Sequence, residues 1–144
     1  MDIRLVLNEM LVKLFRDINT IEEKAMQTNE YKGVTTNDMH VIEAIGLGSP
    51  KNMSTVAKAL SVTMGTLTIS VNSLVKKGFV QRVRSEEDRR VVFVSLTEAG
   101  KKAYEHHRVF HDKMIDSIIK NLDEQEQEIL EKTLAGLNDF FKTV

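Results

Sequence analysis

The sequence predicts a mainly α-helical protein of the α+β class, with one short β-hairpin among its helices. Apolar residues recur every three or four positions along most of the chain, which is the spacing of helices that bury one face. Two stretches rich in β-branched residues flank a charged turn in residues 85–90. At 144 residues the chain is about one domain long and can bury a core without disulfide bonds.

The composition indicates a soluble protein. No stretch approaches the roughly 18 apolar residues of a membrane span. Asp2, Arg4 and Glu9 interrupt the apolar run that a signal peptide would need. The chain has no Cys, which fits a reducing compartment. We therefore expect a cytoplasmic protein.

The N-terminal part predicts two helices. The first covers residues 2–27, because its apolar residues are spaced by three or four positions. These residues are Ile3, Leu7, Leu11, Leu14, Ile18 and Ile21. The second helix covers residues 36–47, where Thr35 or Thr36 can cap the N-terminus and Asp38 lies near the positive end.

The middle of the chain predicts a helix-turn-helix. A short helix over residues 54–60, with Ser54 as its N-cap, is followed by the three-residue connection "SVT". Thr63 then caps a helix over residues 64–77, and Gly78 stands where a left-handed C-terminal glycine belongs. A short helix, a tight turn and a capped helix form the helix-turn-helix pattern.

The hairpin follows this pattern directly. Its strands are predicted over residues 79–84 and 91–96, and the six residues "SEEDRR" join them. A hairpin in this place predicts a winged helix-turn-helix domain, which covers residues 36–97.

The C-terminal part predicts two more helices. Thr97 caps a helix that extends to about residue 121. Asp123 and Glu126 form a capping box for a last helix over residues 124–142.

The helices at the two ends of the chain predict a dimer. Their apolar stripes are wider than a domain of this size can easily cover by itself. Residues 1–35 and 98–144 are therefore predicted to be long dimerisation helices, which pack with their counterparts in a symmetric homodimer. Packing of these helices only on each other is the alternative.

The charge is unevenly distributed along the chain. Residues 51–100 hold eight Lys or Arg and four Asp or Glu, whereas the other 94 residues hold twelve and seventeen. A basic middle on a chain of net charge −1 indicates a polyanionic partner. A solvated surface is the alternative.

One face of the helix over residues 64–77 is small, polar and free of acidic residues. This face consists of Gly65, Thr66, Thr68, Ile69, Asn72, Ser73 and Lys76. It can enter the major groove of double-stranded DNA, where Asn72 can read adenine at two points and Ile69 can touch a thymine methyl. Glu and Lys would be expected there if the helix only faced water.

Basic residues and the hairpin tip predict contacts to the DNA backbone. Candidates for phosphate contacts near the two helices are Lys51, Ser54, Lys58, Lys76 and Lys77. The hairpin tip carries Asp88, Arg89 and Arg90. A narrow minor groove attracts an inserted Arg, and a neighbouring Asp can hold that Arg with a two-point pair. On spacing alone, a solvated turn with a weak ion pair is an equal alternative.

Several motifs resemble the MarR family of dimeric winged-helix repressors. They are "LSV" at residues 60–62, "KGFV" at 77–80, "DRR" at 88–90 and "LTEAG" at 96–100. The resemblance covers the whole chain and implies a homodimer on a pseudo-palindromic operator. It also implies that Arg90 enters the minor groove, that Asp88 supports the wing, and that Thr66, Thr68, Ile69 and Ser73 face the major groove. Many members carry Arg where this chain has Ile69 and Ser73, which favours an AT-rich operator.

Further motifs resemble a subgroup of that family that represses fatty-acid biosynthesis genes. They include "VTMGTLT" at residues 62–68, "RVRSEEDRRVV" at 82–92 and "H..FH..M" at 107–114. The resemblance implies that long-chain acyl-acyl carrier protein is a co-repressor that strengthens DNA binding, and it implies no other cofactor.

An acyl chain needs an apolar pocket, and the acidic carrier protein needs a basic rim. The family places its effector pocket between the DNA-binding domain and the dimerisation helices. Candidates for the lining are Leu14, Ile18, Met39, Ile42, Val109, Phe110 and Met114, although each could simply be a core residue. Candidates for the rim are Arg84 and Lys102.

The histidines offer a different effector. His107 and His111 are four residues apart on one helix face, a spacing that can bind zinc, so a zinc-sensing repressor is the alternative function. A zinc site would need a further ligand, which Glu105 or His40 could supply. Alternatively, His40, His107 and His111 are polar members of the pocket or the interface, and the role of His106 is open. The chain has no catalytic triad spacing, no glycine-rich phosphate loop and no HExxH motif, so we expect no enzyme activity.

Overall fold

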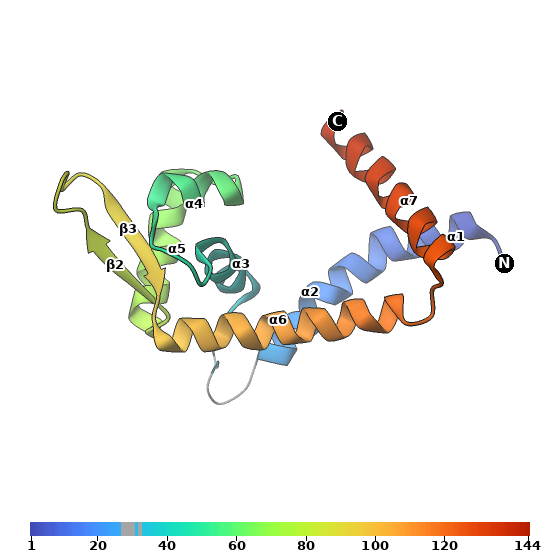
Figure 1. Ribbon diagram of the computed structural model, residues 1–144, viewed down its shortest axis with the longest axis horizontal. Helices are drawn as coiled ribbons and strands as arrows, with labels where there is room; N and C mark the ends of the chain where they lie inside the picture. Colours follow the sequence, from blue (N-terminus) through green and yellow to red (C-terminus); the bar gives the residue numbers. More distant parts are fainter. Residues whose placement is uncertain (27–30, 32) are drawn as a thin grey trace. The chain divides into compact units, whose positions relative to one another are not determined.

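The computed structural model describes residues 1–26, 31 and 33–144 of the chain, and Figure 1 shows its helices and strands. The chain divides into two compact units, residues 1–108 and 109–144, and each is described by itself. None of the helices in the described residues is both long enough and apolar enough to cross a membrane.

The first unit begins with three consecutive helical segments. They are α1 (Ile3–Glu9), the π-helical η1 (Met10–Leu14) and α2 (Phe15–Met26). Asp2 caps α1, since its Oδ1 accepts from the backbone N–H of Arg4 at 2.9 Å. The predicted long helix over residues 2–27 is helical over residues 3–26, and its spacing did not predict the π-helical turn at η1. Residue 27 lies outside the described residues.

Three further helices form the helix-turn-helix region. They are α3 (Thr36–Ile45), α4 (Met53–Leu60) and α5 (Met64–Lys77). Thr35 caps α3 in a capping box, because its hydroxyl accepts from Asp38 N at 3.1 Å and Asp38 Oδ2 accepts from Thr35 N at 3.0 Å. Thr63 caps α5 and Gly78 ends it at φ +86°, so both predicted ends of this helix are confirmed.

The start of α4 differs from the prediction. Its N-cap is Asn52, whose Oδ1 accepts from the backbone N–H of Thr55 at 2.8 Å, and the helix begins one residue before Ser54. The Ser54 hydroxyl itself donates to the same oxygen at 3.1 Å. The prediction of Ser54 as N-cap is therefore wrong, because Asn and Ser are both good caps and only the backbone conformation at residue 52 decides between them.

The three strands form one antiparallel sheet. They are β1 (Lys51–Asn52), β2 (Val80–Arg84) and β3 (Val92–Leu96), in the order β1–β3–β2. The β2–β3 hairpin is the predicted one, with Val80 opposite Leu96 and Arg84 opposite Val92. β1 was not predicted from the sequence, because two residues are too short to show a periodic pattern.

The core of the first unit holds α3, α4, α5 and the β2–β3 hairpin in place. Leu67, Val71 and Leu74 of α5 are fully buried, as their spacing predicts. They belong to a cluster contributed by several elements. Its other members are Met26, Tyr31, Val34, Met39, Val41, Ile42, Ile45, Val56, Ala57, Phe79, Val80, Val94, Leu96 and Ala103. Because the inner face of α5 is locked in this core, its outer face has a fixed orientation.

Two long helices complete the chain, α6 (Glu98–Ile119) and α7 (Glu124–Lys142). The Thr97 hydroxyl accepts from Gly100 N at 3.1 Å and so caps α6. The predicted capping box of α7 is confirmed, with Asp123 Oδ1 accepting from Glu126 N at 2.8 Å and Glu126 Oε1 accepting from Asp123 N at 3.1 Å. α6 passes from the first unit into the second after Arg108.

Candidate nucleic-acid interface

The outer face of α5 is exposed and nearly free of charge. Ile69 is 73% exposed, which is unusual for a large apolar side chain on a helix with a buried opposite face. Gly65, Thr66 and Asn72 are exposed beside it. Ser73 is partly buried, so of the predicted base-facing residues it is the least accessible. Because most of its side chains are short and none is acidic, this face can come close to an anionic surface without electrostatic repulsion.

The threonines of this face use their hydroxyl groups locally. The Thr68 hydroxyl donates to the Met64 carbonyl at 2.8 Å, and the Thr66 hydroxyl accepts from the Thr63 hydroxyl at 3.0 Å. Thr63 in turn accepts from the Thr66 backbone N–H. With these bonds made inside the helix, the methyl groups of Thr66 and Thr68 add to the apolar character around Ile69.

Asn72 contacts the wing, which is the β2–β3 hairpin over residues 80–96. The guanidinium of Arg82, in β2, donates to the side-chain oxygen Oδ1 of Asn72. α5 also packs against β2 along this edge, and Figure 1 places the hairpin beside α5. The wing and the helix that precedes it are therefore joined by a polar side-chain contact as well as by the core. No role could be assigned to Arg82 from the sequence.

The wing tip contains the two-point pair expected of Asp88 and Arg90. Arg90 Nε donates to Asp88 Oδ1 at 3.1 Å and Arg90 Nη2 donates to Oδ2 at 3.2 Å, while the Arg90 backbone N–H also donates to Oδ1. The Arg90 side chain remains 91% exposed. These hydrogen bonds from Arg90 hold the pKa of Asp88 below its ordinary value, so the carboxylate stays charged beside the guanidinium.

Arg84 stabilises the same turn from the strand side. Its Nη1 donates to the carbonyl of Arg89 at 2.8 Å, and the Ser85 N–H donates to the Val91 carbonyl at 2.9 Å. Arg89 stands between Asp88 and Arg90 in the chain, and its side chain is exposed. The turn therefore presents two arginines on a backbone that is closed by its own hydrogen bonds.

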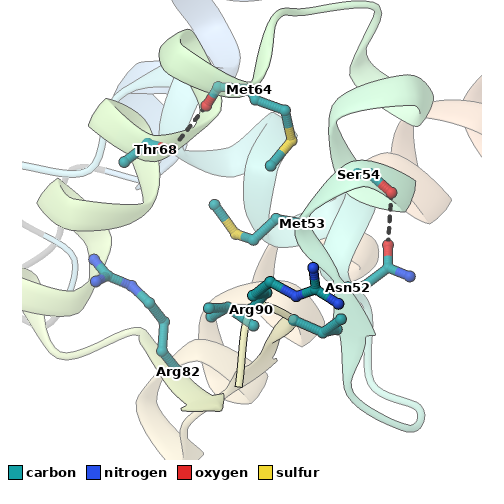
Figure 2. A pocket seen from close by; sticks show the side chains of 9 residues that line it. Asn52, Met53, Ser54, Met64, Thr68, Arg82 and Arg90 are labelled. Carbon is teal, nitrogen blue, oxygen red and sulfur yellow. Dashed lines mark hydrogen bonds between the residues drawn. The ribbon is translucent and has the colours of Figure 1, made fainter. Parts of the chain in front are cut away.

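A cleft of about 360 Å³ separates the wing from the start of α4 and α5. Its lining consists of Asn52, Met53, Ser54, Met64, Thr68, Arg82, Arg90, Val91 and Val92. Figure 2 shows Met53 and Met64 directed into it, with Arg82 and Arg90 approaching from the wing. The cleft places Ser54 and Arg90, predicted from distant parts of the sequence, on one surface.

Two of the lysines predicted to contact phosphates also make contacts within the protein. Lys51 Nζ donates to the Ala44 carbonyl at 3.0 Å, near the end of α3. Lys77 Nζ lies 2.6 Å from Asp38 Oδ2 and 2.9 Å from the Gly33 carbonyl. Lys58 and Lys76 are exposed. Adjacent lysines look alike in sequence, and only the fold brings an acceptor to Lys77.

The residues predicted for an effector pocket are spread over both units. Met39 and Ile42 are buried in the core of the first unit, whereas Ile18 is partly exposed and Leu14 is exposed. The remaining three, Val109, Phe110 and Met114, belong to the second unit.

The two predicted rim residues lie at different places in the first unit. Arg84 is in the wing turn, where it donates to Arg89. Lys102 is at the start of α6, where it lines a pocket of about 270 Å³ with Tyr31, Phe79 and Ala99.

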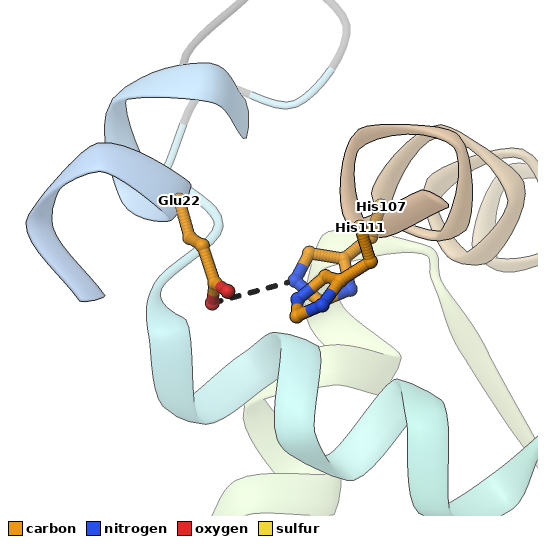
Figure 3. Close-up of side chains that lie close together, drawn as sticks. All are labelled: Glu22, His107 and His111. Carbon is orange, nitrogen blue, oxygen red and sulfur yellow. Dashed lines mark ion pairs between the residues drawn. The ribbon is translucent and has the colours of Figure 1, made fainter. Parts of the chain in front are cut away.

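His107 is buried among three elements of the first unit. Its Nε2 lies 3.6 Å from Glu22 Oε2 of α2, as Figure 3 shows, and its Nδ1 contacts Glu43 Oε1 of α3. The pKa of His107 is raised above its ordinary value of 6.5, first by the hydrogen bond to Glu43 and also by the charge of Glu22, against the opposing effect of burial. His111 follows one turn later in α6 and belongs to the second unit. The neighbouring His106 contacts the Ala25 carbonyl through Nε2 at 3.1 Å.

These features define a winged helix-turn-helix protein that binds DNA, and comparison with known proteins identifies its family. The model of the family "Transcriptional regulator SarA/Rot" matches residues 24–107. The chain belongs to this family of MarR-like winged-helix transcriptional regulators, which are not enzymes.

Individual relatives agree with this assignment. The crystal structure of Streptococcus pneumoniae FabT in complex with DNA is 37% identical, covers 97% of this chain and 98% of its own, and superposes with a TM-score of 0.88. The uncharacterised HTH-type transcriptional regulator YpoP of Bacillus subtilis is 28% identical over 85% of this chain and 79% of its own length. A MarR transcriptional regulator of Methanosarcina mazei shares the fold at 21% identity, with a TM-score of 0.72 over 96% of this chain and 99% of its own.

Proposed function

We propose that the protein is a repressor of fatty-acid biosynthesis genes that binds DNA as a homodimer. The observation that carries this proposal is the 37% identity to FabT, which extends over 97% of the chain. The motifs that resemble fatty-acid synthesis repressors lie in α5, the wing and α6, so they are not confined to one element. That FabT structure contains DNA, which supports the same mode of action here.

In the proposed complex, one α5 helix of the dimer enters the major groove of each half of a pseudo-palindromic, AT-rich operator. Ile69, Thr66 and Thr68 present methyl groups to thymine methyls, while Ser54 and Lys76 contact phosphates. Gly65 allows close approach, and Asn72 and Ser73 lie on the same face. Arg90 enters the minor groove beside each half-site, with Asp88 holding it and Arg89 next to it.

The dimer is supported by exposed apolar residues on the terminal helices. On α1, Ile3 and Leu5 are largely exposed. On α7, considered by itself, Ile129, Phe140 and Phe141 are exposed to a similar degree. Apolar surface of this extent is typical of helices that pack with a second subunit.

Long-chain acyl-acyl carrier protein is the proposed co-repressor, with no other cofactor. Its acyl chain would require an apolar lining from the predicted pocket residues, and Lys102 is a basic side chain that could meet the acidic carrier protein. A co-repressor strengthens DNA binding only if it binds the DNA-competent state more tightly than the other state.

A zinc-sensing repressor that uses His107 and His111 is the second candidate. The observation that favours it is the burial of His107 between the carboxylates of Glu22 and Glu43, because imidazole and carboxylate are common zinc ligands. A zinc ion at this place would be held by Glu22 of α2 and His107 of α6. Because Glu43 of α3 contacts the same imidazole, zinc binding would also affect the position of α3.

The experiment is an operator titration by fluorescence anisotropy under three conditions. Long-chain acyl-acyl carrier protein is expected to tighten binding, whereas the carrier protein without an acyl chain leaves it unchanged. Zinc and a chelator are added in the third condition, with His107→Gln and His111→Gln as variants. One result would overturn the fatty-acid proposal in favour of zinc sensing. In that result, operator affinity responds to zinc, this response is lost in the two variants, and the acyl form of the carrier protein has no effect.

A further inference from the structure

The contact between Arg82 and Asn72 constrains how the recognition helix can read a base. A guanidinium carries only hydrogen-bond donors, so the amide of Asn72 must turn its oxygen toward Arg82. The donor group Nδ2 branches from the same carbon and therefore faces away from Arg82. Among the described residues, Nδ2 has no hydrogen-bond partner. It is thus available to a partner from outside the chain.

Both backbones that carry this contact are fixed. Arg82 pairs with the buried Val94 in the β2–β3 ladder. Asn72 follows the fully buried Val71 in α5. The two side chains themselves are exposed, so the contact lies on the outer face of α5, which is the face proposed to meet DNA. Arg82 also lines the cleft that holds Arg90, which places it between the wing tip and α5.

We propose that Arg82 is a positioning residue that determines base specificity at Asn72. An unconstrained Asn reads adenine at two points, since Oδ1 accepts from the N6 amino group while Nδ2 donates to N7. The oxygen Oδ1 has two lone pairs, and Arg82 takes one of them. The positive guanidinium beside Oδ1 disfavours a second donor such as the N6 amino group, so the donor Nδ2 is the group left to read the base. Asn72 then recognises an acceptor on the base edge, which is N7 of either purine, O6 of guanine or O4 of thymine. This inference rests on the proposed placement of α5 in the major groove.

The test first locates the base that Asn72 contacts. Operator half-sites are selected from a randomised library with the wild-type protein and with Asn72→Ala, and the position that loses its preference in the variant is the contacted one. Analogues at that position then remove single groups: a 7-deazapurine lacks N7, and purine nucleoside in place of adenine lacks the N6 amino group. Where the selected base is guanine or thymine, the matching analogue lacks O6 or O4.

In the wild type, removal of the acceptor is expected to weaken binding by about three- to tenfold, whereas removal of the N6 amino group changes it less than about twofold. Arg82→Met keeps the aliphatic stem and removes the donors, which frees Oδ1 of Asn72. In this variant the loss of N6 is expected to weaken binding by about three- to tenfold, and selection shifts toward adenine. Arg84→Met is the matched control on the same strand, and its response to the analogues should equal that of the wild type.

Three outcomes would overturn the proposal. The first is a wild type that is already sensitive to the loss of N6. The second concerns an Arg82→Met variant that folds normally, as judged by thermal unfolding. Its affinity would fall equally on all DNA sequences, and the slope of log affinity against log salt concentration would be lower by about one, as for a lost phosphate contact. The third is unchanged sequence selection by both Asn72→Ala and Ile69→Ala, which would remove α5 from the major groove and the role of Arg82 with it.

Discussion

Lys77 Nζ lies 2.6 Å from Asp38 Oδ2, which joins the last turn of α5 to the first turn of α3. The Asp38 side chain is only 5% exposed, and it also accepts the Thr35 N–H of the capping box. A buried carboxylate that loses its partner charge is strongly destabilising. Lys77→Met is therefore expected to lower the free energy of unfolding by about 1–3 kcal/mol, measured by urea denaturation.

Lys76 is the matched control for this variant. It precedes Lys77 in the same helix and is exposed. Lys76→Met should change the free energy of unfolding by less than about 0.5 kcal/mol. It should instead lower the slope of log operator affinity against log salt concentration by about one. Equal stability of the two variants would contradict the structural role of Lys77.

Gly100 allows α6 to begin against the backbone of the wing. A Cβ atom at this position would lie 2.0 Å from the Phe79 carbonyl oxygen, and that oxygen already accepts the Thr97 N–H. Gly100→Ala must push the start of α6 away from β2, and we expect it to lower the free energy of unfolding by about 1–3 kcal/mol.

Gly65→Ala provides the control for Gly100→Ala. In α5, a Cβ at Gly65 would meet only the Thr63 hydroxyl at 4.0 Å. This substitution should raise the stability of the free protein by about 0.5–1 kcal/mol, because Ala is the better helix former. The prediction fails if thermal unfolding shows the same sign of change for both variants.

Arg90→Ala tests the wing. If Arg90 enters the minor groove, its removal should weaken operator binding by about five- to hundredfold in a gel-shift titration. Stability and dimerisation should not change, since the side chain is exposed and paired only at the tip. Asp88→Asn should weaken binding less, because Arg90 stays but is held less firmly. Near-wild-type affinity of Arg90→Ala would remove the wing from the interface.

The dimer can be tested on the exposed apolar face of α7. Phe140→Asp places a charge where we expect a partner subunit, so it should shift the protein from dimer to monomer in sedimentation equilibrium. Ile69→Asp is the control, because Ile69 is equally apolar and exposed but lies on α5. It should leave the dimer intact and abolish operator binding. Loss of dimer in the control alone would place the subunit interface on α5.

His107 predicts a pH dependence of stability. Its pKa is raised in the folded state, mainly by the hydrogen bond to Glu43, so folding favours the protonated form. The stabilisation is therefore fully present below the unfolded pKa of about 6.5, and it is lost as the pH rises through the higher folded pKa.

The measurement compares the wild type with His107→Gln in the presence of a chelator. At low pH the variant should be less stable by about 1–3 kcal/mol, and the difference should shrink as the pH rises above the folded pKa. His40→Gln is a suitable control because this residue is exposed on α3. A stability difference that does not vary with pH would show that the pKa of His107 is the same in the folded and the unfolded protein, which would contradict the raised pKa.

The sequence predicted the order and type of the long elements because their signals are local. Helix caps at Thr63 and Asp123 depend on residues three positions away, and so does the buried stripe of α5. The pair of Asp88 and Arg90 is also local, but the spacing left Arg89 and Arg90 as alternatives, and the family resemblance assigned Arg90. The sequence does not decide which of two nearby residues with similar capping ability is the N-cap, as Asn52 at the start of α4 shows.

By itself, then, the sequence determined a winged helix-turn-helix with an acid-poor outer face on α5 and a charged wing tip. Only the tertiary structure decided which polar side chains have partners within the chain. Lys77 is bound to Asp38, 39 residues earlier in the chain, and Asn72 is bound to Arg82 on the wing. Such partners come from different elements that meet only after the core has formed, so no periodicity or spacing along the chain can reveal them.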